Sequence, residues 1–201
     1  DNTPKYANDN EMIREEVIRR IIDVTGEDPI VSTTGKTSRE LFELRVARGE
    51  THGHDFLTVG SMGHSSSIAL GIALQRPDKK VWIIDGDGAM LMHMGSMAVM
   101  GAYAPSNIVH IVVNNASHES VGGQPTIADH MDVVKIAEGC GYPHAVSVDN
   151  YEALEKALAE AKALDELFFI EVKGAIGSRA DLGRPTTTAR ENKENFMEHL
   201  K

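Results

Sequence analysis

Two short segments of the chain combine acidic or amide side chains with glycine and other small residues. Residues 84–89 (Ile-Asp-Gly-Asp-Gly-Ala) end one apolar run, and residues 113–117 (Val-Asn-Asn-Ala-Ser) end another. Short apolar runs that are rich in β-branched residues are typical of buried strands. The carboxyl ends of parallel strands meet at one edge of an open α/β sheet, where ligands bind. We therefore expect Asp87 and Asn115 to lie close together.

These residue types suit a divalent cation. A carboxylate, an amide oxygen and a main-chain carbonyl form an oxygen-only set, which Mg²⁺ prefers when it bridges a protein to phosphates. Gly88 and Ala89 would let main-chain N–H groups approach the same phosphates at the start of a helix. Gly-Asp-Gly alone is usually a turn and Asn-Asn alone is usually a loop. The pair, placed after two apolar strands, is a more specific signal for a metal–diphosphate site.

Composition limits the class of protein. The chain has 201 residues, 41% of them hydrophobic and 25% charged, with a formal net charge of −10 and one cysteine, Cys140. This length suits one α/β domain with a sizeable core. The negative charge disfavours nonspecific nucleic-acid or membrane binding, and no apolar run is long enough to span a membrane. No signal peptide is apparent, and a lone cysteine fits a reducing compartment, so we expect a cytoplasmic protein.

Apolar periodicity predicts alternating strands and helices. Strands are expected over residues 30–33, 55–59, 81–86, 108–113, 144–148 and 167–172, and helices over about 10–24, 37–48, 65–75, 89–102, 132–138, 151–164 and 189–200. This order predicts a doubly wound parallel sheet of about six strands with helices on both faces. Residues 1–10 are expected to form a linker or arm and residues 11–201 a single domain.

Some local patterns have simpler readings. Thr37 and Glu40 have the spacing of a capping box at a helix start. The methionines of residues 89–102 lie near helical spacing, which indicates core packing. His52 and His54 could suggest a second metal site, but their spacing and loop setting favour ordinary surface histidines.

The two opening segments together resemble the thiamine diphosphate-dependent enzymes, in which Gly-Asp-Gly is followed about two dozen residues later by Asn-Asn. The resemblance implies the thiamine diphosphate-binding fold and the cofactors thiamine diphosphate and Mg²⁺. It assigns the metal to Asp87, the Asn115 side chain and the Ser117 carbonyl. The implied diphosphate contacts come from residues 86–89, namely Gly86, Asp87, Gly88 and Ala89.

Two further segments fit this family. Residues 60–63 (Gly-Ser-Met-Gly) resemble the segment that holds the aminopyrimidine ring. The resemblance implies contacts from Gly60, Ser61 and Met62, with the Met62 side chain wedged beneath the cofactor. After the first strand, the family places further diphosphate contacts, which would be Gly35, Lys36 and Thr37 here. Taken alone, residues 60–63 are more typical of an ordinary strand-to-helix turn, and a lysine such as Lys36 more commonly faces solvent.

Residues 114–126 (Asn-Asn-Ala-Ser-His-Glu-Ser-Val-Gly-Gly-Gln-Pro-Thr) are similar to the phosphonopyruvate decarboxylases of this family. That similarity implies release of CO₂ from phosphonopyruvate to leave phosphonoacetaldehyde, a reaction on a small 2-oxo acid with an anionic tail. It places His118, Ser120 and Gln124 on the substrate side, with His118 also near the cofactor. Arg179 and Arg184 are expected to bind the phosphonate from a mobile lid, or else to be solvated surface arginines.

One required group has no counterpart in the sequence. Thiamine enzymes activate the cofactor with a glutamate of a pyrimidine-binding domain, and every predicted strand here is already assigned. We therefore expect a pyrimidine-binding domain or subunit as partner, an inactive isolated chain, and a homo-oligomer for the full enzyme. The start at Asp1 favours a fragment of a single-chain enzyme. The alternative is the β subunit of a sulfopyruvate decarboxylase, in which the two halves are separate chains.

A function of another class is a non-catalytic, nucleotide-binding Rossmann-like module, which rests on fold analogy alone. A Rossmann fingerprint needs Gly-x-Gly-x-x-Gly after the first strand. Residues 33–36 (Thr-Thr-Gly-Lys) lack that pattern, so we favour the enzyme reading.

Overall fold

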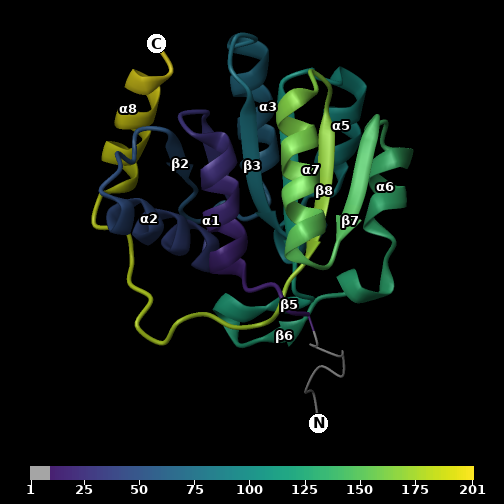
Figure 1. The fold of residues 1–201 in the computed structure, drawn as a ribbon, viewed down its shortest axis with the longest axis horizontal. Helices are drawn as coiled ribbons and strands as arrows, with labels where there is room; N and C mark the ends of the chain where they lie inside the picture. The colour runs from purple at the N-terminus through teal and green to yellow at the C-terminus, as the bar shows by residue number, and fades with distance from the viewer. Residues whose placement is uncertain (1–9) are drawn as a thin grey trace.

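A parallel six-stranded sheet forms the centre of the computed structural model, which describes residues 10–201 (Figure 1). Its strands are β1 (Ile30–Ser32), β2 (Asp55–Leu57), β3 (Val81–Gly86), β4 (Ile108–Asn114), β7 (His144–Val148) and β8 (Phe168–Lys173). They lie in the order β2-β1-β3-β4-β8-β7, and every neighbouring pair is parallel. The predicted sheet is confirmed. The predicted linker over residues 1–10 lies outside the described residues except for Asn10.

Helices cover both faces of the sheet, as predicted (Figure 1). One face carries α1 (Arg14–Thr25), α2 (Lys36–Arg48) and α7 (Tyr151–Ala163), and the other carries α3 (Ser65–Gln75), α5 (Gly95–Tyr103) and α6 (Val133–Gly139). Side chains alternate between the faces along each strand. Trp82 and Ile84 of β3 accordingly enter the first core, and Ile83 enters the second. This burial on both faces explains why the strands read as continuous apolar runs.

The helix predicted over residues 89–102 is two helices, so that prediction was wrong. α4 (Asp87–Met92) begins at the predicted metal ligand itself, and α5 begins only at Gly95. His93 leaves the helix with φ −132° and ψ 44°, two residues before Gly95, where α5 begins. Met90, Met97 and Met100 are buried in the second core, which confirms their packing role.

The capping box predicted at Thr37 and Glu40 is also wrong. α2 starts at Lys36 after Gly35, which has a φ of +95°, and no side chain caps this helix. Glu40 instead points into the protein, where it pairs with Arg14. A capping box does occur at Thr188 and opens α8 (Ala189–His199), the closing helix beside the edge strand β2 (Figure 1).

The loop after β4 is more ordered than the sequence indicated. It contains a short antiparallel hairpin of β5 (Ser117–His118) and β6 (Gln124–Pro125), joined by the single turn η1 (Glu119–Val121). A second turn, η2 (Ala128–His130), follows before α6. Within residues 10–201, no helix has the length and apolar character needed to cross a bilayer.

Candidate active site

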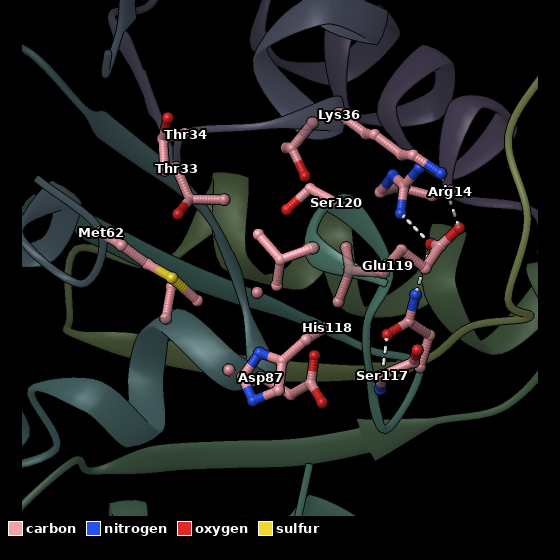
Figure 2. Close-up of a pocket in the computed structure, with 17 residues that line it drawn as sticks. Arg14, Thr33, Thr34, Lys36, Met62, Asp87, Ser117, His118, Glu119 and Ser120 are labelled. Carbon is pink, nitrogen blue, oxygen red and sulfur yellow. Dashed lines mark hydrogen bonds and ion pairs between the residues drawn. The ribbon is translucent and has the colours of Figure 1, made fainter. Parts of the chain in front are cut away.

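A cavity of about 100 Å³ lies at the carboxyl ends of β1, β3 and β4, the edge predicted for ligands. Figure 2 shows the side chains that surround it. The lining residues are Arg14, Thr33, Thr34, Lys36, Thr37, Met62, Gly86, Asp87, Gly88, Ala89, Val113, Asn115, Ser117, His118, Glu119, Ser120 and Val121. Segments that are distant in sequence therefore meet in one place, chiefly the start of α2, the start of α4 and the loop after β4, with Arg14 and Met62 beside them.

Asp87 supplies a buried carboxylate to this cavity. Only 3% of the residue is exposed, and its Oδ2 accepts a hydrogen bond of 2.5 Å from the Thr126 hydroxyl. Burial raises the pKa of Asp87 by disfavouring the charged form, although Thr126 and the main-chain N–H of Gly88 act in the opposite direction. A cation beside this carboxylate would remove the cost of burying its charge.

Asn115 and Ser117 face the same cavity from the loop after β4. The Asn115 Oδ1 accepts from the Ser117 N–H at 3.1 Å, which makes a tight turn around Ala116 at a φ of +54°. The Asn115 Nδ2 donates to Glu119 at 2.6 Å. Among residues 10–201, the buried Ser117 hydroxyl has no hydrogen-bond partner. Because a carbonyl-type oxygen has two lone pairs, Asn115 Oδ1 can still accept or coordinate once more.

Glu119 is the centre of a buried charge network that sequence reasoning missed. It accepts from Arg14 Nη1 at 2.5 Å, Lys36 Nζ at 3.3 Å and the Gly177 N–H at 3.0 Å. Burial opposes its ionisation, but Arg14 and Lys36 outweigh that effect and hold the pKa of Glu119 below its usual value. Arg14 is fixed in turn by both oxygens of Glu40, at 2.7 and 2.9 Å. Figure 2 shows Arg14 and Lys36 on one side of Glu119 and Ser117 on the other.

Met62, Gly88 and His118 meet at another part of the cavity wall. A Cβ atom on Gly88 would lie 2.6 Å from the His118 ring and 3.3 Å from Met62 Cε. Only glycine allows this close approach of the α4 backbone to both side chains. The predicted cofactor residue Gly35 lies outside the lining but near Ser120, whose Oγ would be 3.5 Å from a Cβ there.

Several predicted site residues lie outside the cavity lining. Gly60 and Ser61 are exposed just before Met62, and the Gly60 N–H donates to Thr34 Oγ1 at 3.2 Å. Gln124 is exposed on β6, where it pairs with His118 across the hairpin.

Arg179 and Arg184 line a different cavity, of about 610 Å³, beside α1 and α2. Arg179 donates to Glu15 at 2.9 Å, to Asp181 at 3.0 Å and to Glu43. These carboxylates, Glu43 foremost, raise the pKa of Arg179 and hold its guanidinium in ion pairs. In the same region, His52 stacks on Phe42 at 4.0 Å between ring centroids.

The donor set of the cavity fits Mg²⁺ and a diphosphate. Asp87 offers a carboxylate, Asn115 an amide oxygen, and Ser117 both a carbonyl and a free hydroxyl, all of them hard oxygen ligands. The start of α4 and the ammonium of Lys36 supply N–H groups and positive charge for phosphate oxygens.

Comparison with known proteins places the chain in a family. Residues 33–172 match the family described as thiamine pyrophosphate enzyme, C-terminal TPP binding domain, so the chain belongs to the thiamine pyrophosphate enzymes. Phosphonopyruvate decarboxylase of Streptomyces viridochromogenes is 38% identical over 89% of this chain and 43% of that protein. Phosphonopyruvate decarboxylase of Streptomyces hygroscopicus is 40% identical over 84% of this chain and 41% of that protein. The chain thus spans less than half the length of these relatives.

Two other similarities are informative. Sulfopyruvate decarboxylase subunit beta of Methanocaldococcus jannaschii is 35% identical over 74% of this chain and 76% of that subunit. The solved thiamine diphosphate-dependent 4-hydroxybenzoylformate decarboxylase of Rhodococcus jostii RHA1 superposes with a TM-score of 0.68 at 19% identity, over 89% of this chain and 35% of that one. The second similarity shows a shared fold.

Proposed function

We propose that this chain is the diphosphate- and Mg²⁺-binding half of a thiamine diphosphate-dependent decarboxylase that converts phosphonopyruvate to phosphonoacetaldehyde and CO₂. The observation that carries this proposal is the cavity in which the start of α2, the start of α4 and the loop after β4 converge. Two relatives named phosphonopyruvate decarboxylase, 38% and 40% identical, support the choice of substrate.

In this proposal, the metal ligands are Asp87, the Asn115 side chain and the Ser117 carbonyl. The diphosphate would be held by residues 35–37 and 86–89, and the aminopyrimidine ring by residues 60–62. Bound thiamine diphosphate supplies the electron sink that 2-oxo acid decarboxylation requires. His118 and Ser120 line the cavity and can exchange protons with a bound 2-oxo acid, whereas Gln124 would act from the rim. Arg179 and Arg184 would reach a phosphonate only if residues 174–188 moved.

The proposal also requires a partner that supplies the activating glutamate from a pyrimidine-binding domain or subunit. We expect no CO₂ release from phosphonopyruvate by the isolated chain with Mg²⁺ and thiamine diphosphate. Adding the pyrimidine-binding half of a phosphonopyruvate decarboxylase should restore turnover. A demonstrably assembled complex that releases no CO₂ would reject the proposal.

Sulfopyruvate is the rival substrate, because sulfopyruvate decarboxylase subunit beta of Methanothermobacter thermautotrophicus is 32% identical over 94% of this chain. Measuring kcat/KM for both substrates with the same assembled complex separates the two. The substrate with the larger kcat/KM is the preferred one.

A calorimetric titration tests the binding chemistry apart from turnover. We expect heat of binding from thiamine diphosphate with Mg²⁺ and none from NAD. Tight NAD binding without a response to the thiamine cofactor would instead support the nucleotide-binding module.

A further inference from the structure

The two ends of the Asn115 amide have opposite chemistry. The oxygen can coordinate a cation, whereas the NH₂ group is a donor that would repel one, and rotation by half a turn exchanges them. Two contacts determine which end faces which way. The Ser117 N–H requires the oxygen at 3.1 Å, and the Glu119 carboxylate requires the nitrogen at 2.6 Å.

Glu119 is itself held firmly. Its side chain is 7% exposed, and its two oxygens receive bonds from Arg14, Lys36, Asn115 and the Gly177 N–H. The Arg14 guanidinium is anchored separately by Glu40. With four donors on two oxygens, Glu119 has no free position from which to bind a metal ion. Any effect of Glu119 on a metal ion must therefore act through a neighbouring side chain.

The preceding asparagine provides an internal comparison. Asn114 Oδ1 accepts from the Ala116 N–H at 3.1 Å, and Asn114 Nδ2 donates to the buried Glu171 at 2.7 Å. The loop therefore contains two consecutive asparagine turns, each with its nitrogen fixed by a buried glutamate. Only the second asparagine lines the cavity.

We propose that Glu119 is a positioning residue that fixes the Asn115 amide with its oxygen available to the cation. This inference rests on the proposed function, which makes Asn115 a metal ligand. It assigns Arg14 and Lys36 the task of stabilising the Glu119 carboxylate rather than binding substrate directly. It also gives a reason for the contacts of Glu119 with two residues distant in sequence, Arg14 and Gly177.

The test measures cation affinity rather than turnover. The full 201-residue chain is titrated with Mn²⁺ in the presence of thiamine diphosphate, and free Mn²⁺ is followed by electron paramagnetic resonance. Glu119→Met removes the acceptor in an unbranched side chain of similar length, and we expect Mn²⁺ binding to weaken about tenfold, which corresponds to about 1.4 kcal/mol. The matched control Glu171→Met removes the acceptor for Asn114 and should change the Kd by less than about threefold.

A charge-neutral exchange tests the mechanism itself. In the double variant Asn115→Asp with Glu119→Gln, the NH₂ donor of the pair moves from residue 115 to residue 119. The carboxylate at position 115 then presents an oxygen to the cavity in either orientation. We expect the double variant to bind Mn²⁺ more tightly than Glu119→Met, because a carboxylate oxygen is available to the cation in either orientation. Equal weakening by Glu119→Met and Glu171→Met, or no recovery in the double variant, would overturn the inference in favour of general loop damage.

The unaltered chain gives a measurement that does not depend on a variant folding. The side-chain NH₂ of Asn115 should exchange slowly with D₂O in a ¹⁵N-labelled sample because Glu119 holds it in a buried bond. Fast exchange would overturn the inference, as would unweakened Mn²⁺ binding by Glu119→Met. If the unaltered chain binds no Mn²⁺, the proposed function itself fails, and this inference fails with it.

Discussion

Within residues 10–201, the Asp87 carboxylate accepts one side-chain hydrogen bond, from the hydroxyl of Thr126, although the two residues come from different segments of the chain. The apolar runs before Asp87 and Asn115 were enough to predict that both would face one cavity. The site roles of Thr126, Arg14 and Glu40 were not predicted. Their hydrogen-bond partners lie in distant segments of the chain, and no local sequence pattern relates those segments. The Arg14–Glu119 pair, for example, joins the first helix to the loop after β4.

Replacing Thr126 by valine tests the support of Asp87. Valine keeps the shape but removes the donor to a buried carboxylate, so we expect the free energy of unfolding to fall by about 1–3 kcal/mol at neutral pH. Urea denaturation measures the loss. The control Thr34→Val removes a hydroxyl that accepts from the exposed Gly60 N–H, and we expect a change within about 0.5 kcal/mol. Equal losses would mean that the Thr126–Asp87 bond contributes no special stability.

Asn192 links helix α8 to the sheet by two hydrogen bonds. Asn192 Oδ1 accepts from the Leu57 N–H at 2.9 Å, and its Nδ2 donates to the Asp55 carbonyl at 2.8 Å. Asn192 therefore satisfies main-chain groups of the edge strand β2, which would otherwise be open to pairing with another chain. The sequence predicted the helix but not the role of Asn192, since residue type alone does not show whether an asparagine is buried or exposed.

The variant Asn192→Ala should lower the free energy of unfolding by about 1–3 kcal/mol, because the Leu57 N–H and Asp55 carbonyl lose their buried partner. Chemical denaturation monitored by circular dichroism measures the change. On the exposed side of the same helix, Asn195→Ala is the matched control and should alter stability by at most about 0.5 kcal/mol. An unchanged midpoint for Asn192→Ala would contradict the role assigned to this side chain.

Two helix glycines have opposite environments. A Cβ on Gly101 of α5 would lie 1.8 Å from the Cys140 carbonyl oxygen, whereas a Cβ on Gly71 of α3 would meet no atom within 4 Å. Alanine should therefore stabilise the protein at position 71 by about 0.5–1 kcal/mol, the usual gain in a helix. At position 101 it should destabilise by about 1–3 kcal/mol through overpacking. Thermal unfolding of both variants checks the signs, and stabilisation by Gly101→Ala would refute the close packing of α5.

The parallel sheet followed from the alternation of strands and helices, since parallel strands require crossover connections, but its strand order was not predicted. The break between α4 and α5 did not, because residues 89–102 keep an apolar helical period through His93. Long-range regularity was therefore enough to predict the parallel sheet, whereas the break at His93 leaves no signal in the apolar period.

Ligand binding to the cavity should stabilise the entire chain. With thiamine diphosphate and Mg²⁺ at about 100 times their Kd, the native state gains about 2.7 kcal/mol, which corresponds to a rise in Tm of about 5–10 °C. Differential scanning calorimetry measures this rise, and a chelator such as EDTA should reverse it. A Tm that responds to neither addition would argue against a metal–diphosphate site in this chain.

The cavity wall is assembled from β1, β3 and β4, strands that are adjacent in the sheet but separated along the chain by whole helices. Such non-local parallel pairings form slowly, so the ligand site is complete only once these strands have paired. The cofactor and cation should therefore slow the unfolding rate without accelerating refolding. In stopped-flow experiments, only the unfolding limb of the chevron plot should shift when they are added.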